Sequence, residues 1–246
     1  METYKAKINY LYNSGFTVET ENYLLIFDYY KDSTDNGYKS ISNGAVGEED
    51  LKTQKKVIVF SSHSHFDHFN PIILKWKQIR PDIHYILSSD INIDKNDRNN
   101  YINMLSVYED LHIDNLYVKA FSSNDIGISF LVKVDNITIF HSGDLNWWHW
   151  WDENEEFNSK MEKSFKSEIE KIKSNSIDIA FFPVDSRLKE YYFIGGEYFI
   201  KKINPNLFIP MHFREDFNVT KKFKEKIKAA NTKIVDISKR GEQILY

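Results

Sequence analysis

The chain has 246 residues, of which 41% are hydrophobic and 28% charged, close to the average of soluble globular proteins. A chain of this length buries about 70–75% of its unfolded surface, which is enough for a substantial core. The absence of cysteine excludes disulfides, thiol nucleophiles and thiolate-bound metals. The net charge of −4 argues against nucleic acid and anionic lipid as partners.

The first ten residues alternate charged and apolar side chains and lack the apolar segment of a signal peptide. No apolar run elsewhere approaches the length that spans a bilayer. We therefore expect a cytoplasmic protein with no membrane partner. The sequence leaves the oligomeric state open.

The predicted elements begin with strands and continue as strands alternating with helices. Short β-type runs separated by turn residues predict an antiparallel meander over 7–12, 16–19 and 23–28. An uninterrupted apolar run predicts a buried strand at 57–60, and Pro71 opens a helix that ends before Pro81. Further strands are predicted at 83–87, 116–121, 128–134, 137–141, 177–184, 207–209 and 234–237, and helices at 159–173, 196–203 and 220–230.

This order predicts two halves, about 1–113 and 114–246, that each contain a mixed sheet with outer helices. Linker-like composition is missing, because glycine and proline are scarce at 9 and 5 residues. We therefore expect one layered α/β domain over 1–246.

Four potential metal ligands follow the strand at 57–60 within six residues, namely His63, His65, Asp67 and His68. His63 and His65 can face the same way if the chain stays extended, and Asp67 with His68 can turn toward a neighbouring position. One loop could then serve two metals. Imidazole and carboxylate ligands suit zinc, and also iron or manganese. The alternative, a solvated histidine-rich turn, fits poorly with so regular a string.

The segment from His63 to His68 resembles the His-x-His-x-Asp-His signature of the metallo-β-lactamase superfamily. Residues 139–144, which end in Gly143-Asp144, and residues 209–213, which contain His212, resemble two later motifs of the same superfamily. The resemblance covers nearly the whole chain and implies a four-layer αββα sandwich of two mixed β-sheets flanked by helices. The hairpin at residues 14–16 and the His-Ser-Gly-Asp motif are most similar to the lactonase-like and phosphodiesterase-like branch.

The resemblance also implies a ligand set with a bridging carboxylate. His63 and His65 would bind a first metal; Asp67, His68 and His212 would bind a second, and Asp144 would bridge them. The superfamily usually supplies another histidine near the position of Ser123, and this chain has none there. His141, Asp125 or His149 could substitute, or the first metal could be weakly held, so one or two metal ions remain open.

These residues predict a metal-dependent hydrolase that uses zinc, with manganese and iron as alternatives. A bound metal would activate a water toward an ester, lactone or phosphodiester of a small molecule. Asp67 and His141 are the candidates to orient or transfer protons. Two alternatives stay open: an RNA or nucleotide phosphodiesterase, which the acidic charge disfavours, and a non-catalytic binding protein, which the missing histidine favours. The superfamily's redox di-iron members typically carry a carboxylate where this chain has His65.

Other residues have two interpretations each. Asp28, at the end of a predicted strand, could orient a ligand histidine or simply end the strand. Arg187 could bind an anionic substrate, although a salt bridge with Asp185 is the more usual arrangement. The tryptophan-rich segment 147–151 could form a pocket wall or pack against the domain.

Overall fold

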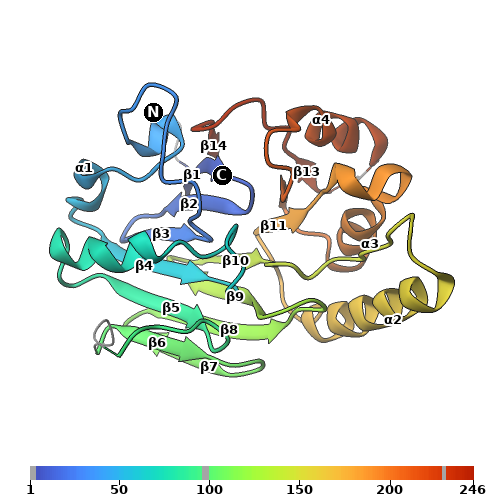
Figure 1. Cartoon of the computed structure of the whole chain (residues 1–246), viewed down its shortest axis with the longest axis horizontal. Coiled ribbons are helices and arrows are strands. Elements are labelled where there is room, and N and C mark those ends of the chain that lie inside the picture. Colours follow the sequence, from blue (N-terminus) through green and yellow to red (C-terminus); the bar gives the residue numbers. More distant parts are fainter. Residues whose placement is uncertain (1–3, 96–99, 229–230) are drawn as a thin grey trace. The chain divides into compact units, whose positions relative to one another are not determined.

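The structure is a computed structural model that describes residues 4–95, 100–228 and 231–246. The chain divides into two compact units, Met1–Ser106 with Ser238–Tyr246, and Val107–Ile237. Each unit contains one seven-stranded mixed sheet (Figure 1). The last nine residues thus belong to the first unit, and the single domain over 1–246 stays a prediction. Within the described ranges, no helix is long and apolar enough to cross a membrane.

The sheet of the first unit has the order β14-β1-β2-β3-β4-β5-β6. β1 pairs antiparallel with β14 and β2, and β2 antiparallel with β3, whereas β3 to β6 are mutually parallel. These strands and the short helices η1, α1 and η2 span Lys7–Tyr12 (β1), Gly15–Glu19 (β2), Tyr23–Phe27 (β3), Ile41–Asn43 (η1), Glu48–Leu51 (α1), Lys56–Ser61 (β4), Pro71–Gln78 (η2), His84–Ser88 (β5), Ile102–Leu105 (β6) and Gln243–Leu245 (β14).

Apolar side chains from these strands pack with those of the short helices into one cluster. Leu51 of α1 and Trp76 of η2 lie in this cluster with Val57 and Val59 of β4. β4 is buried along almost its whole length, which explains why it reads as an uninterrupted apolar run. The core therefore fixes the carboxyl ends of β3 and β4, which are parallel and end at the same edge.

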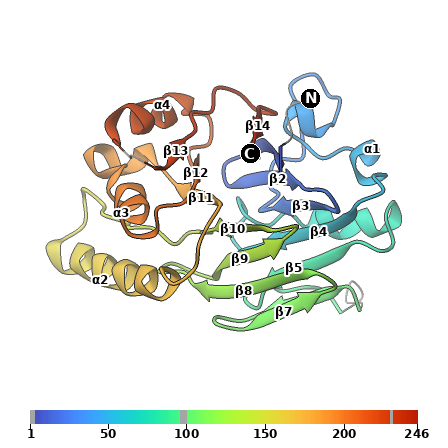
Figure 2. The ribbon, with the colours of Figure 1, turned by 180° about the vertical axis from the view of Figure 1, so that it is seen from behind.

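The sheet of the second unit has the order β13-β12-β11-β10-β9-β8-β7. β7 to β10 pair antiparallel, and β10 to β13 pair parallel. The elements of this unit, seen from behind in Figure 2, span Asp110–Ile113 (β7), Leu116–Ser122 (β8), Ile128–Val134 (β9), Ile137–His141 (β10), Glu155–Ile172 (α2), Ile179–Pro183 (β11), Ser186–Tyr191 (η3), Ile194–Ile203 (α3), Leu207–Met211 (β12), Phe217–Lys226 (α4) and Lys233–Ile234 (β13).

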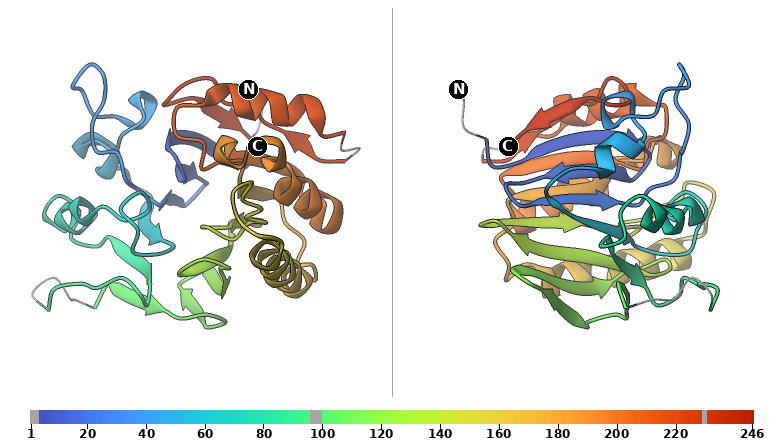
Figure 3. Two further views of the ribbon diagram at one scale, coloured as in Figure 1. Left: turned by 45° about the vertical axis from the view of Figure 1, so that its right-hand side comes forward. Right: turned by 90° about the vertical axis from the view of Figure 1, so that its left-hand side faces the viewer.

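The helices α2, α3 and α4 gather beside the sheet of the second unit (Figure 3), where phenylalanines join them to it. Phe199 of α3 packs on Phe140 of β10, with 5.5 Å between ring centroids, and on Phe182 of β11 at 4.6 Å. Phe223 of α4 stacks on Phe208 of β12 at 5.1 Å. Such aromatic pairs contribute about 0.5–1.5 kcal/mol each beyond the area they bury. This packing holds β10, β11 and β12 parallel, so their carboxyl ends share one edge.

Several predicted elements differ from the structure. The predicted helix after Pro71 is a 3-10 helix, which Asn70 caps by accepting a hydrogen bond from the Ile72 amide. α2 begins four residues earlier than predicted, because the Asn154 side chain caps it by accepting from the Phe157 amide. β6, β7 and β14 carry no strand pattern and were not predicted. The helix predicted at 220–230 extends to 229–230, which lie outside the described residues.

Candidate metal centre

In the first unit, Asp28 lies directly after β3 and beside the end of β4. Its backbone N–H donates to the Phe60 carbonyl at 2.9 Å, which continues the β3–β4 pairing by one residue. Its φ is +42°, a left-handed conformation that aspartate tolerates better than most residues. This turn directs a fully buried carboxylate toward the loop that follows β4.

The Asp28 carboxylate accepts hydrogen bonds from that loop. The Ser62 amide donates to Oδ1 at 2.8 Å, and the Ser62 hydroxyl donates to Oδ2 at 2.7 Å. His68 Nδ1 lies 2.7 Å from the same Oδ2. Because a carboxylate accepts, Nδ1 of His68 carries the proton, and Nε2 is the nitrogen suited to a metal. The predicted role of Asp28 as a partner of a ligand histidine thus matches its position.

The other three predicted ligands of the first unit lie around His68. Nε2 of His63 is 3.0 Å from Nδ1 of His65, and the ring centroids of His63 and His68 are 4.0 Å apart. Asn13 Nδ2 donates to Asp67 Oδ2 at 3.2 Å. His63, Asp67 and His68 are buried, and His65 is exposed. The loop after β4 therefore gathers three imidazoles and one carboxylate.

In the second unit, Asp144 and His212 come from strands about seventy residues apart. Asp144 follows β10 and His212 follows β12, where a φ of +65° turns the histidine out of the strand. Nε2 of His212 lies 3.4 Å from Oδ1 of Asp144, and both side chains are buried. The structure therefore brings the two predicted ligands of this unit together.

The Asp185 carboxylate contacts Nδ1 of His212, as the Asp28 carboxylate contacts Nδ1 of His68. Asp185 follows β11, the strand next to β12, and its Oδ2 lies 2.9 Å from Nδ1 of His212. Nε of Arg187 donates to both carboxylate oxygens, at 3.0 and 2.9 Å. Burial raises the pKa of the Asp185 carboxyl, but hydrogen bonds from His212 and Arg187 outweigh this effect and lower the pKa to about 2. Asp185 is thus an anion at neutral pH and accepts the Nδ1 proton of His212, which makes Nε2 the nitrogen of the neutral ring that is suited to a metal.

His141 ends β10 and is fully buried. The Gly143 amide donates to its Nδ1 at 3.3 Å, which places the proton of the neutral ring on Nε2. Its ring centroid lies 5.8 Å from that of Phe181. His141 thus braces the turn that carries Asp144.

The loop near Ser123, where the resemblance led us to look for a further histidine, contains Asn124. Nδ2 of Asn124 donates to the Asn146 carbonyl at 2.7 Å, and Oδ1 accepts from the Asn146 amide at 3.0 Å. The Asn124 side chain therefore links two loops, because both ends of its amide are hydrogen-bonded to the backbone of Asn146. Asp125 is exposed, and His149 packs against Tyr191 with 3.9 Å between ring centroids and an interplanar angle of 38°.

The tryptophan-rich segment packs largely within the second unit. Trp148 donates from Nε1 to the Asp144 carbonyl at 2.8 Å, and its ring centroid is 5.4 Å from that of His212. Trp147 packs near Phe165 of α2 and Tyr198 of α3. Only Trp151 has a large exposed fraction, 50%. Trp148 thus borders the Asp144–His212 pair directly.

Sequence reasoning assigned Asp185 only as a salt-bridge partner and did not identify Ser62, Asn13 or Asn124. The signal for Asp185 was present: it ends a strand, and the strand that ends in His212 lies next in the sheet. Parallel neighbours end at the same edge, so a carboxylate after one strand can face a histidine after the next. The partners Ser62, Asn13 and Asn124 gave no comparable signal, because serine and asparagine are common in ordinary turns.

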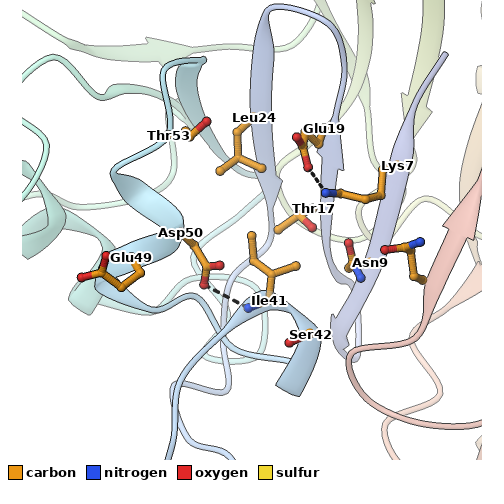
Figure 4. Close-up of a pocket in the computed structure, with 11 residues that line it drawn as sticks. Lys7, Asn9, Thr17, Glu19, Leu24, Ile41, Ser42, Glu49, Asp50 and Thr53 are labelled. Atoms are coloured by element: carbon orange, nitrogen blue, oxygen red, sulfur yellow. Dashed lines mark hydrogen bonds and ion pairs between the residues drawn. The ribbon is translucent and has the colours of Figure 1, made fainter. Parts of the chain in front are cut away.

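A separate cavity of about 340 Å³ lies on the first unit (Figure 4). Its floor is formed by β14, β1, β2 and β3, with Asn9 and Thr17 facing each other in register, and its wall by η1 and α1. Lys7 and Glu19 form an ion pair at its rim. Predicted site residues are missing from its lining, so this cavity is distinct from the candidate metal centre.

A scan against protein-family models finds no match, and a search of curated proteins finds none either. Solved structures do match over the whole length. Igni18, a metallo hydrolase from the archaeon Ignicoccus hospitalis, is 16% identical with a TM-score of 0.62, and 98% of each chain is covered. A diphosphatase of the PhnP family is 11% identical with a TM-score of 0.54, again with 98% of each chain covered.

CmlA, a diiron β-hydroxylase from Streptomyces venezuelae, is 9% identical with a TM-score of 0.62, and the match covers all of this chain and 54% of that one. The chain thus spans about half the length of CmlA. YhfI, a metallo-β-lactamase fold protein from Bacillus subtilis, is 14% identical with a TM-score of 0.60, and the match covers 99% of this chain and all of that one. At such low identity these likenesses show the fold alone, which is the metallo-β-lactamase fold. The predicted class, two mixed sheets flanked by helices in an α/β sandwich fold, is confirmed.

Proposed function

We propose that this protein is a metal-dependent hydrolase that acts on an ester, lactone or phosphodiester bond of a small molecule. The fold is shared with Igni18, which is itself a metallo hydrolase. The observation that carries the proposal is the separation of 3.4 Å between His212 Nε2 and Asp144 Oδ1. Two ligands of one tetrahedral zinc ion, each bonded at about 2.0–2.2 Å, lie about 3.4 Å apart.

The chemistry of the donors also fits a metal. Each buried carboxylate behind a histidine fixes the ring tautomer, Asp28 for His68 and Asp185 for His212. We propose that His63, His65, Asp67, His68, Asp144 and His212 hold one or two ions, in the roles that the superfamily resemblance implies. Nitrogen and oxygen donors without sulfur suit Zn²⁺ first, and Mn²⁺ or Fe²⁺ as alternatives. A bound ion of this kind supplies a water that is acidic enough to be a nucleophile near neutral pH.

We propose that two residues of this chain, Asp67 and His141, orient or transfer protons. Asp67, oriented by Asn13, can accept a proton at its carboxylate. Nδ1 of His141 accepts a hydrogen bond from the Gly143 amide, so the neutral ring can donate a proton only from Nε2. We propose that Asp67 orients the attacking water and that His141 positions the Asp144 turn or delivers a proton. The predicted cytoplasmic location and small-molecule partner belong to the same proposal.

The first test is the metal content of the purified protein, measured by elemental mass spectrometry. We expect one or two equivalents in the wild type and a loss of metal in His65→Ala and Asp144→Asn. His112→Ala is a matched control, because His112 lies in the edge strand β7 and is not a predicted ligand. Stoichiometric metal that is unchanged in both ligand variants would contradict the proposed site.

A second measurement separates hydrolysis from its alternatives. Nitrophenyl esters, lactones and phosphodiesters would be tested with zinc, manganese and iron, and we expect turnover that His68→Ala abolishes. Metal binding without turnover of any substrate would favour the non-catalytic alternative. Tight RNA binding that weakens steeply with salt would favour a nuclease.

A further inference from the structure

Beside His212, two segments of the second unit interleave cations with aromatic rings. Trp148 stacks on Trp150 with 5.9 Å between centroids and an interplanar angle of 6°. Arg187, whose side chain is 45% exposed, lies over the Trp150 ring with 5.6 Å from its guanidinium carbon to the centroid. Lys189 Nζ lies over the Trp151 ring. We call Trp150, Trp151, Arg187 and Lys189 the cationic rim.

Arg187 is held rigidly at one end of this rim. Asp185 accepts hydrogen bonds from both Nε and Nη2 of Arg187, and the guanidinium lies over the ring of Trp150, which itself stacks on Trp148. Nη2 of Arg187 also lies 3.4 Å from Nδ1 of His212. The guanidinium is therefore oriented next to a proposed metal ligand, with its Nε and Nη2 bound to the Asp185 carboxylate and its half-exposed side chain at the rim.

Lys189 is placed at the other end by an unusual backbone. Its φ of 51° and ψ of −121° interrupt the 3-10 helix η3, a conformation that costs a residue other than glycine about 1–3 kcal/mol. Among the described residues, no carboxylate forms an ion pair with Lys189, and its ammonium rests on the half-exposed Trp151. A strained lysine on an exposed aromatic ring has no evident structural purpose, and such strain is concentrated at binding sites.

The chemistry of the rim defines the ligand. Arg187 and Lys189 are N–H donors with positive charge, so they select an anion, and the indole rings of Trp150 and Trp151 offer flat faces to a ring. We propose that the cationic rim binds an anionic group attached to a planar ring, such as an aryl or nucleoside phosphate. This inference rests on the proposed function, since it makes the rim the part of the active site that selects the substrate.

Binding by the rim can be measured without turnover and without metal. Four of the five tryptophans lie at 147–151, so intrinsic fluorescence reports on this segment. We would titrate protein stripped with EDTA with phenyl phosphate and, as the neutral counterpart, with benzyl alcohol. We expect a saturable change with phenyl phosphate, with a dissociation constant of about 1 mM or tighter, and at least tenfold weaker binding of benzyl alcohol.

Lys189→Gln removes the positive charge and approximately keeps the side-chain length. We expect this variant to weaken the binding of phenyl phosphate about fivefold or more. Lys201→Gln is the matched control on the exposed face of α3 and should leave binding unchanged. Lys189→Gly should weaken binding to a similar extent and raise Tm by about 2–4 °C, because glycine relieves the strained backbone. A gain in stability with a loss of binding is not expected of a merely structural lysine.

The inference would be overturned by the absence of a saturable change with phenyl phosphate, by equal binding of benzyl alcohol, or by wild-type affinity in Lys189→Gln. Phenyl phosphate that binds only after zinc is restored would also overturn it, while supporting the proposed metal centre. Binding that persists in stripped protein and depends on Lys189 supports the rim, even if the metal-content measurement contradicts the proposed function.

Discussion

The two units each place a carboxylate behind a histidine, but they stabilise that carboxylate differently. Asp28 is fully buried and is held by hydrogen bonds from Ser62 and His68 inside the first unit. Asp185 is also buried, yet a half-exposed guanidinium, that of Arg187, compensates its charge. The same contact, a carboxylate on Nδ1 of an imidazole, is thus stabilised by a buried hydrogen-bond network in one unit and by an ion pair that reaches the surface in the other. The two should therefore respond differently to the same substitution.

The largest expected effect is that of Asp28→Asn. Asparagine tolerates the left-handed backbone, so the shape is kept. Its side-chain NH₂ group must however face one of the groups that now donate a hydrogen bond to Asp28. The amide also lacks the negative charge that attracts these donors. We expect the free energy of unfolding to fall by about 2–4 kcal/mol and the metal affinity to fall about 10–100-fold.

Urea denaturation of metal-stripped protein measures the first quantity, and competition with a chelator the second. Asp35→Asn, at an exposed position, is the matched control. A variant as stable as the wild type would mean that the Ser62 and His68 hydrogen bonds contribute little, and the proposed contrast between the units would be wrong.

Asp185→Asn should reduce metal affinity to a similar extent but stability by less. Arg187 loses its partner in this variant, yet its guanidinium is half-exposed and can be solvated by water. We expect a loss of about 1–2 kcal/mol in the free energy of unfolding, and we expect the added substitution Arg187→Gln to cost little more, because the pair acts as a unit. A loss equal to that of Asp28→Asn would remove the distinction between the two carboxylates.

The first half of the candidate site can be predicted from the sequence because its proposed ligands lie close together in the chain. His63, His65, Asp67 and His68 share one loop, so their spacing alone predicts a cluster. Asp144 and His212 were found only through the motifs that resemble a known superfamily, since their contact depends on β10 and β12 ending at one edge with β11 between them. The contact of Asp185 with His212 depends on the same topology, because it requires that β11 and β12 be neighbours and end at one edge.

The fold shows the same division between local and non-local information. The strands with a clear apolar pattern were predicted within one or two residues, as for β4 and β9. β6 and β7 were not, because they are short edge strands with partly exposed side chains and lack alternation. β14 was missed for another reason: its partner β1 is more than two hundred residues away, and its three residues carry no pattern of their own.

Glu19 extends the comparison to a carboxylate that is itself partly exposed, as are the two lysines that pair with it. It pairs with Lys7 and, at 2.9 Å, with Lys55, at the rim of the cavity in Figure 4. Burial raises the pKa of Glu19, but the hydrogen bonds from the two lysines lower it by more than burial raises it, so the pKa falls below 4.5. The folded state thus binds this proton less tightly than the unfolded state. Its stabilisation is complete above about pH 4.5 and is lost as the pH falls through the lower folded value.

Glu19→Gln should therefore have the smallest effect and the clearest pH dependence. Because the pair is partly exposed and screened, we expect a loss of about 0.5 kcal/mol at pH 7, measured by urea denaturation. The difference from the wild type should begin to close near pH 4.5 and vanish below the folded pKa, where the wild-type side chain is also neutral. Glu21→Gln, at an exposed position, should show no difference at either pH. A difference that persists in acid would mean that Glu19 stabilises the first unit by packing, and that charge compensation in solvent contributes nothing measurable.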